Sequence, residues 1–287
     1  MTLPRSSGIV TAEWLCDHLG ERGIIVLDAT WAPKGTNPTA DELYAAQHIP
    51  GARRFDIDHI SDHASSLPHM LPTAEEFAAE AGLLGIGDDD LIVTYDAGGM
   101  ASAAARVWWM FRVFGHDKVA VLDGGLPNWL ANGRPMDRGA PSAPIPKSFL
   151  ANFRPELVRD LEAVKSISEN GGETLVDARA AGRFEGIAPE PWANGRGGHI
   201  PNSRSLPFTE LVDPVTKTLL SVEQLRAKLT AAGAIDGPIV ASCGSGVTAC
   251  VIALALNHIG RPDIAVYDGS WAEWGLHTEL PAATGPT

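Results

Sequence analysis

Short apolar runs rich in β-branched residues alternate along the chain with longer apolar stretches. The short runs are typical of buried strands in a parallel sheet, and they occupy residues 91–95, 119–122, 238–241 and 264–267. Two of the longer stretches directly follow such strands and predict helices over residues 101–114 and 247–258. This order of strand, turn and helix predicts an α/β fold in which each domain has a mostly parallel sheet with helices on both faces.

The second half of the chain repeats the motifs of the first half in the same order. The matched pairs, at offsets of 145 to 151 residues, are Asp28 with Asp177, His48 with His199, Asp96 with Cys243, Asp123 with Asp268, and the capping boxes Thr73–Glu76 with Ser221–Gln224. A period this long indicates tandem domains, because solenoid repeats are much shorter. We therefore predict a first domain over residues 1–134, a linker rich in proline and glycine over 135–150, and a second domain over 151–287.

The charge balance restricts the class of partner. The chain has 22 basic and 35 acidic residues, a net charge of −13, so we expect neither nucleic acid nor an anionic membrane as a partner. The longest uninterrupted apolar run, 249–256, is far shorter than the roughly 20 residues of a membrane span. The first eight residues lack an apolar signal region, and three cysteines are too few for a disulfide framework. These features predict a cytoplasmic protein.

One strand-to-helix turn carries the residues of a nucleophilic site. Cys243-Gly-Ser-Gly246 lies between a predicted strand and a predicted helix, at the carboxyl edge of the sheet, where α/β proteins bind their ligands. Backbone N–H groups and the positive end of the helix dipole favour the thiolate there, and the glycines let the loop curl around the sulfur. Ser245 and Thr248 add hydroxyl donors. We expect Cys243 to be a nucleophile, the alternative being a buried, inert thiol.

The other candidate residues have structural interpretations. Asp96 occupies the matching turn of the first copy, so only the second copy can provide a thiol nucleophile. Cys16 and Cys250 lie in apolar helical patterns and are expected to be packing residues. His48 and His199 occur once in each copy, so we expect their rings to bond to nearby backbone. The histidines have no ligand-like spacing, and we expect no metal site and no cofactor.

Two chemistries use a cysteine loop of this kind. Phosphatases place an arginine six residues after the cysteine to hold phosphate, but that position is Ala249 here. Transfer of sulfane sulfur needs only a thiolate and a cradle for the persulfide.

The chain resembles the two-domain rhodanese family almost from end to end. The segments that carry the resemblance are Cys243–Ala249, Phe55–Asp58, His69–Pro72, Arg106–Phe111 and Leu122–Gly125. The neutral loop after the cysteine is similar to that of the 3-mercaptopyruvate sulfurtransferase branch, whereas the thiosulfate branch has basic residues there. The resemblance implies two tandem rhodanese-like domains, of which the second is catalytic.

The resemblance also implies roles for individual residues. Arg183 matches an arginine that binds the substrate carboxylate, for which a guanidinium fork is well suited. Ser245, His69 and Asp58 match a relay that moves a proton during the reaction, which would require both copies to contribute to one site. The loop residues that would bind substrate and persulfide are Gly244, Gly246, Val247 and Thr248.

One segment departs from the family pattern. The family has Pro-Glu-Pro-Arg where this chain has Pro189-Glu-Pro-Trp192, so a second carboxylate-binding arginine is missing. Arg196 would supply the charge from a glycine-rich segment, or Trp192 would form a pocket wall. We expect Arg196 to contribute, because a carboxylate substrate in so acidic a protein needs local positive charge.

The resulting hypothesis is an enzyme that moves sulfur from 3-mercaptopyruvate through a Cys243 persulfide to a thioredoxin-like thiol, a small thiol or cyanide, and releases pyruvate. The alternatives are a thiosulfate:cyanide sulfurtransferase and a non-catalytic persulfide carrier that docks partner proteins.

Overall fold

The computed structural model describes residues 8–140, 143–192 and 195–286, which form two compact units. The first unit takes its described residues from 1–62, 71–154 and 214–219, and the second takes the remainder of the described chain, including 63–70. The predicted linker packs along the first unit, where Gly139 N–H donates to Ala45 O at 2.9 Å and Lys147 N–H donates to Gly82 O at 3.0 Å. The boundaries at 134 and 150 stay predictions.

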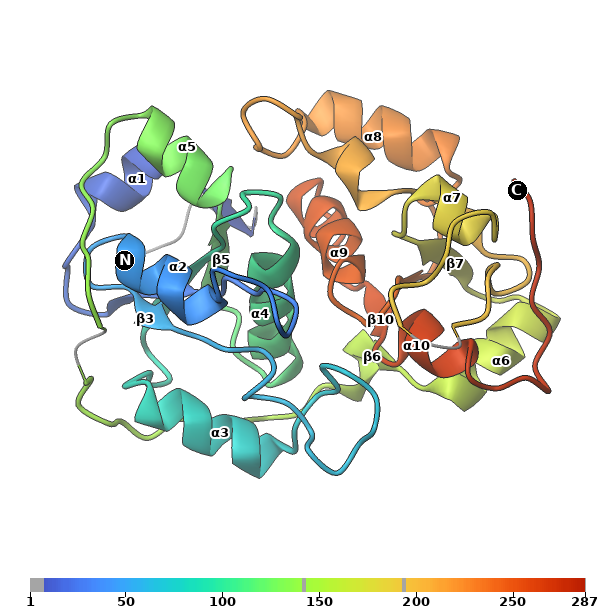
Figure 1. Ribbon diagram of the computed structural model, residues 1–287, viewed down its shortest axis with the longest axis horizontal. Coiled ribbons are helices and arrows are strands. Elements are labelled where there is room, and N and C mark those ends of the chain that lie inside the picture. The colour runs from blue at the N-terminus through green and yellow to red at the C-terminus, as the bar shows by residue number, and fades with distance from the viewer. Residues whose placement is uncertain (1–7, 141–142, 193–194, 287) are drawn as a thin grey trace. The chain divides into compact units, whose positions relative to one another are not determined.

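Each unit contains a five-stranded sheet in which all neighbouring strands are parallel. The order in the first unit is β1 (Ile9–Val10), β5 (Val119–Leu122), β4 (Leu91–Tyr95), β2 (Ile24–Asp28), β3 (Arg53–Arg54). The order in the second unit is β6 (Val158–Arg159), β10 (Ala265–Tyr267), β9 (Ile239–Ser242), β7 (Thr174–Asp177), β8 (Arg204–Ser205). The same topology occurs twice, which confirms the predicted α/β fold and the internal repeat (Figure 1).

Helices connect the strands in both units. In the first unit they are α1 (Ala12–Asp17), α2 (Ala40–Ala46), α3 (Ala74–Leu83), α4 (Ser102–Val113) and α5 (Gly125–Ala131). In the second unit they are α6 (Leu161–Asn170), α7 (Ala181–Phe184), α8 (Val222–Ala231), α9 (Ala249–His258) and α10 (Ser270–Trp274), with 3-10 turns at Pro155–Leu157 and Phe208–Leu211. Both capping boxes form as predicted, on α3 and α8. No helix in the described ranges is long and apolar enough to cross a membrane.

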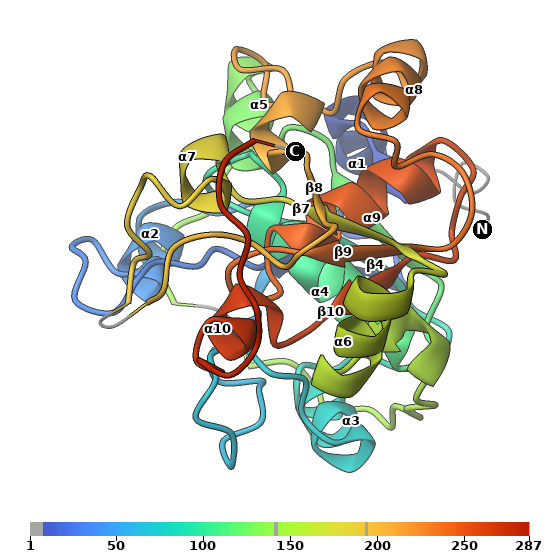
Figure 2. The same cartoon turned by 90° about the vertical axis from the view of Figure 1, so that its right-hand side faces the viewer.

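The sheet of the second unit is covered on both faces. Side chains of α6 and α10 form one apolar cluster with Leu175, Val240 and Tyr267 of the strands. The residues of α9 from 249 to 257 are all buried. Figure 2 shows α6 and α9 on opposite sides of these strands. Burial of both faces explains why the strands have continuous rather than alternating apolar sequences.

The two histidines of the repeated His-Ile-Pro motif have the same surroundings. His48 Nδ1 lies 2.9 Å from Tyr44 O, and its ring stacks on Tyr44 with centroids 4.0 Å apart. His199 Nδ1 lies 2.9 Å from Phe184 O, and its ring stacks on Phe184 at 3.7 Å. Their predicted structural role is confirmed: each ring joins a helix end to the turn that follows it.

The turn that opens α5 requires a residue without a side chain. Gly125 has a φ of +52°, and a Cβ there would lie 2.6 Å from Asp96 O and 2.9 Å from Gly99 Cα. Both neighbours are backbone atoms, so they cannot move aside cheaply. The packing of α5 against the end of β4 therefore depends on glycine at this position.

Replacing Gly125 with alanine should lower the free energy of unfolding by about 2 kcal/mol or more, because left-handed strain and a backbone clash combine. Gly133 is a matched control: its φ is +63°, but nothing lies within 4 Å of its Cβ position. Gly133→Ala should cost only about 1 kcal/mol. Urea denaturation measures both, and equal losses would show that the clash is relieved by a small backbone shift.

Candidate active site

Cys243 lies where the sequence places it, directly after the central strand β9 and before α9. Its relative exposure is 1%, so water has little access to the residue. Strand β9, which Cys243 follows, pairs with β7 on one side and with β10 on the other. The cysteine is therefore fixed at the carboxyl edge of the sheet, as predicted for a reactive group.

The first turn of α10 holds the cysteine loop in shape. Ser270 Oγ accepts hydrogen bonds from Cys243 N–H and Gly246 N–H, both at 3.1 Å, and donates to Tyr267 O at 2.7 Å. Cys243 Sγ lies 4.0 Å from the same oxygen. One hydroxyl thus ties together both ends of Cys243–Gly246.

The carbonyl groups of the loop are bound by α10 as well. Trp271 N–H donates to Cys243 O at 3.0 Å, and Ala272 N–H donates to Gly244 O at 2.8 Å. Our sequence reasoning missed Ser270, although the repeat pairs it with Gly125. The only signal in the sequence was a serine where the first copy has a glycine. In the structure Ser270 has the same φ as Gly125, +52°, which is strained for a residue with a side chain.

Four N–H groups of the loop have no hydrogen-bond acceptor among the described residues: those of Gly244, Ser245, Val247 and Thr248. They precede the first turn of α9, a ten-residue helix. Free N–H groups at such a turn attract an anion. The N–H of Gly246, expected to face the sulfur, instead donates to Ser270.

Arg183, in α7, lies against this loop. A methyl group on Gly244 would lie 2.9 Å from Arg183 Nη2 and 3.2 Å from the Trp192 ring. The Arg183 guanidinium carbon lies 5.7 Å from the centre of the Trp192 ring. A cation and an aromatic wall thus stand directly beside the backbone that follows the cysteine.

Arg183 belongs to a row of four alternating charges. Glu190 binds it through Nη2–Oε2 (2.5 Å) and Nε–Oε1 (3.3 Å), and also binds Arg179 Nη1 at 2.7 Å. Arg179 in turn binds Asp177 Oδ2 at 2.7 Å. Burial lowers the pKa of Arg179, but its two carboxylate partners more than offset this, so the pKa lies above its usual value. Sequence reasoning missed Glu190, and only its place inside the Pro-Glu-Pro segment hinted at a role.

Arg196 has different partners. Its Nη1 donates to Leu280 O at 2.8 Å, and its Nη2 lies 3.4 Å from the carbonyl oxygens of Trp274 and His277. Its own carbonyl accepts a hydrogen bond from Trp271 Nε1 at 2.7 Å. These contacts favour a structural role, and binding of substrate by Arg196 stays a prediction.

The three residues of the expected relay come from both units. Ser245 is half-buried in the cysteine loop. His69 is buried, has a φ of +61° and belongs to the second unit. Asp58 belongs to the first unit, where its carboxylate accepts a hydrogen bond from Trp31 Nε1 at 3.1 Å. The relay itself stays a prediction.

The first unit fills the matching position with a carboxyl side chain. Asp96 accepts hydrogen bonds from Gly99 N–H at 2.8 Å and Ala104 N–H at 3.2 Å. Burial raises the pKa of Asp96 above its usual value. A carboxylate that already occupies the N–H groups of this turn leaves no nucleophilic centre there.

Among the described cysteines, Cys16 is half-buried and Cys250 fully buried.

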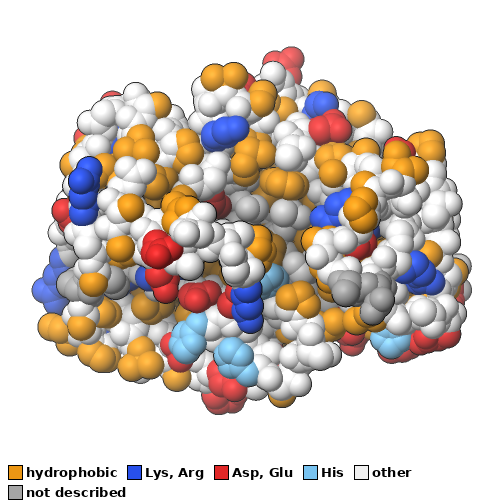
Figure 3. Space-filling model, in the orientation of Figure 1, with side chains coloured by type: hydrophobic (Ala, Val, Ile, Leu, Met, Phe, Trp, Pro, Cys, Tyr) orange, Lys and Arg blue, Asp and Glu red, His pale blue; other side chains and the backbone are white. Residues whose placement is uncertain are grey.

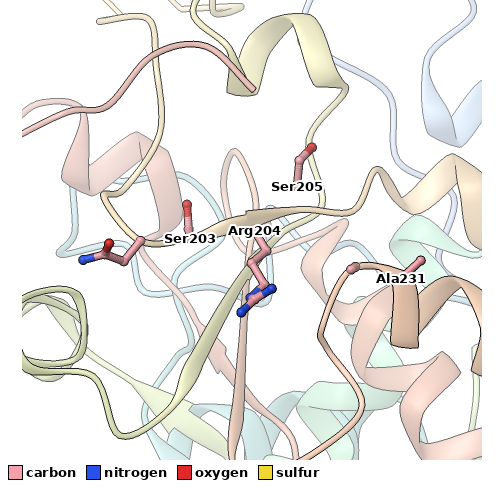
Figure 4. A pocket seen from close by; sticks show the side chains of 6 residues that line it. Ser203, Arg204, Ser205 and Ala231 are labelled. Atoms are coloured by element: carbon pink, nitrogen blue, oxygen red, sulfur yellow. The ribbon is translucent and has the colours of Figure 1, made fainter. Parts of the chain in front are cut away.

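A separate pocket of about 360 Å³ lies at the edge strand β8. Figure 4 shows Arg204 on the opposite side of this strand from Ser203 and Ser205. Arg204 lies against Gly233, at the end of α8, and the equivalent Arg53 donates to Leu84 O at the end of α3. The repetition indicates a structural arginine in each unit.

On the face shown in Figure 3, acidic and basic side chains are interspersed. The described residues include no group of three or more side chains able to hold a metal ion.

Comparison with known proteins agrees with this fold. The rhodanese-like domain model matches residues 11–132 and 160–277, so the chain belongs to the rhodanese family and contains two such domains. It is 44% identical to thiosulfate/3-mercaptopyruvate sulfurtransferase 2 of Arabidopsis thaliana, over 95% of this chain and 85% of that protein. It is 41% identical to 3-mercaptopyruvate sulfurtransferase of Escherichia coli K12, over 95% and 96%.

The solved structures agree as well. The crystal structure of SseA, a 3-mercaptopyruvate sulfotransferase of Escherichia coli, has a TM-score of 0.82 at 40% identity, over 92% of this chain and 99% of that one. The chain is therefore an enzyme of the 3-mercaptopyruvate/thiosulfate sulfurtransferase group.

Glu273 lies in α10, the helix that supports the cysteine loop. Its titration makes the stability of the fold depend on pH. Burial raises the pKa of Glu273 above its usual value. The folded state therefore binds more protons than the unfolded state between the unfolded pKa, about 4.5, and the raised value. Through that window this group stabilises the fold less as the pH rises.

Glu273→Gln should remove this contribution. Thermal denaturation between pH 4 and 8 should show the variant gaining stability relative to the parent as the pH increases. A difference between the two proteins that does not vary with pH would contradict the assignment.

Proposed function

We propose that this protein transfers sulfur from 3-mercaptopyruvate to a thiol or cyanide through a persulfide on Cys243. The observation that carries the proposal is the cysteine loop itself: a single buried thiol, four available N–H groups and one adjacent guanidinium, with no basic residue in the loop. Such a loop suits a donor with a single carboxylate. The names of the relatives above, which include both donors, support sulfur transfer in general.

The proposed first half-reaction begins with the donor carboxylate on Arg183. The Cys243 thiolate attacks the donor sulfur and forms the S–S bond of the persulfide. The carbon–sulfur bond breaks, and its electron pair leaves with pyruvate as the enolate, which takes up a proton. The relay of Ser245, His69 and Asp58 handles the proton, and the loop N–H groups hold the charged persulfide.

In the second half-reaction the acceptor takes the outer sulfur and restores the thiolate. A thioredoxin-like protein thiol, a small thiol or cyanide fits this step, and the cycle is ping-pong. We propose that the reaction runs in the cytoplasm, supported by three cysteines that are free. One Arabidopsis relative is named as mitochondrial, so fractionation of the source cells is the direct test of the compartment.

Cys243 should be the sole sulfur carrier. After treatment with mercaptopyruvate and no acceptor, mass spectrometry should find one extra sulfur on Cys243, and Cys243→Ser should abolish turnover. The matched variants Cys16→Ser and Cys250→Ser should stay active, because neither residue lies in the N–H cradle. A persulfide on Cys16 together with full activity of Cys243→Ser would refute the mechanism.

Donor preference should follow the charge of the loop. The protein should use mercaptopyruvate more efficiently than thiosulfate, and Ser245→Lys should shift the ratio of kcat/KM values toward thiosulfate by about tenfold, because it adds a cation beside the sulfur. Gly244 is left unchanged, since it has no space for a side chain. Ser245→Ala, which removes the relay hydroxyl without adding charge, is the matched control for that loss, and Ser166→Lys, on the exposed side of α6, is the control for an added charge elsewhere. A parent enzyme that prefers thiosulfate would favour the rhodanese alternative.

Arg183 should be the main carboxylate ligand. Arg183→Lys should lower kcat/KM for mercaptopyruvate by about 10- to 100-fold, because lysine cannot provide the paired hydrogen bonds of a guanidinium. Thiosulfate, which has no carboxylate, should be affected less. Arg196→Ala should leave the Michaelis constant nearly unchanged, since Arg196 is bonded to backbone carbonyls. A rise of tenfold or more in that variant would instead support the sequence-based prediction that Arg196 binds the carboxylate.

A further inference from the structure

We propose that Glu190 determines donor specificity by cancelling the charge of Arg183, so that the site accepts a donor with one negative charge and disfavours one with two. The inference rests on the proposed function, since it concerns which donor reaches Cys243. It assigns a task to a buried acid that the sulfur-transfer steps do not use.

The contacts of Glu190 fix the orientation of Arg183. The Glu190 side chain is fully buried, whereas that of Arg183 keeps 27% of its exposure. Both carboxylate oxygens contact the Nε–Nη2 edge of Arg183, at 3.3 and 2.5 Å. Among the described residues, Arg183 Nη1 has no hydrogen-bond partner, so it remains available to a ligand. Glu190 therefore holds the guanidinium beside the loop and leaves one nitrogen for the donor.

The four charges of the hydrogen-bonded row beside the loop sum to zero. Asp177 and Glu190 contribute two negative charges, and Arg179 and Arg183 contribute two positive charges, all joined by hydrogen bonds of 3.3 Å or less. Arg179 is fully buried, and all three of its nitrogens donate to these two acids or to Gly198 O, the last at 2.8 Å. Its burial keeps it from contact with a substrate. The row thus contains two arginines but offers little net positive charge.

This balance distinguishes the two donors. 3-Mercaptopyruvate presents one carboxylate, which one guanidinium nitrogen and the loop N–H groups can bind. Thiosulfate carries two charges and approaches a thiolate, and the row from Asp177 to Arg183 contains no second uncompensated cation to offset the repulsion. Removal of the Glu190 charge would leave Arg183 uncompensated, and the gain should be larger for the dianion.

The test compares three variants with the parent protein. Glu190→Gln removes the charge and keeps the size, and Glu190→Asp keeps the charge and shortens the side chain. Glu173→Gln is the control: Glu173 forms an equivalent two-point pair with Arg159, at 3.0 and 3.0 Å, but precedes β7 at the opposite edge of the sheet. For each protein, kcat/KM is measured with mercaptopyruvate and with thiosulfate at one acceptor concentration, and the melting temperature is recorded.

Glu190→Gln should shift the ratio of the two kcat/KM values toward thiosulfate by about tenfold. Glu190→Asp should lower both values and leave the ratio unchanged, and Glu173→Gln should leave the ratio at the parental value. Calorimetry should show that thiosulfate binds more tightly to the double variant Glu190→Gln, Cys243→Ser than to Cys243→Ser alone. Because neither protein can turn over, this comparison separates the effect of charge on binding from turnover.

Two results would overturn the inference. The first is a ratio of kcat/KM values that is unchanged in Glu190→Gln, together with thiosulfate binding no tighter than in the parent background. The second is a shift of this ratio in Glu190→Asp as large as in Glu190→Gln, which would mean that geometry rather than charge sets the ratio. These outcomes are distinct from failure of the proposed function, which would appear as a parent protein that forms no Cys243 persulfide with mercaptopyruvate.

Discussion

Two backbone N–H groups, those of Cys243 and Gly246, share one acceptor, Ser270 Oγ. This shared bond closes the loop after β9 and leaves the N–H groups of the other loop residues unoccupied. It requires a buried serine in the left-handed region, which costs about 1 kcal/mol of strain. The strain is offset by three hydrogen bonds to one hydroxyl. The position of the Cys243 sulfur, the N–H groups beside it and the start of α9 all depend on this arrangement.

The repeat shows how one scaffold was used in two ways. Gly125 of the first unit has the same backbone conformation as Ser270 but no hydroxyl, and Asp96 replaces the cysteine. There the aspartate carboxylate itself accepts the N–H groups of the turn. The same topology thus satisfies the turn internally in the first unit and leaves it available to a ligand in the second.

Electrostatics complete the site of the second unit. The row from Asp177 to Arg183 is mostly buried, and buried charges are tolerated only when they are paired. Pairing through Glu190 fixes Arg183 beside Gly244 while it cancels most of its charge. Orientation and charge are therefore set by the same carboxylate, which is why the test above separates them with glutamine and aspartate.

The sequence by itself determined the fold, the repeat, the place of the cysteine loop and the structural histidines, because each depends on short-range patterns: apolar periodicity, capping boxes and motifs that recur at one offset. Strands 91–95 and 119–122 were predicted with their observed bounds, and the other predicted strands and helices differ from the observed ones by at most two residues at either end. Ser270 and Glu190 were found only in the tertiary structure. Each acts on a residue 7 to 27 positions away through a hydrogen bond formed when strand ends meet at one edge of the sheet. Arg196, whose role toward the substrate stays a prediction, shows the same limit: its sequence surroundings suggested freedom to reach a ligand, and only the tertiary structure shows that its Nη1 and Nη2 lie against the carbonyl groups of Leu280 and Trp274.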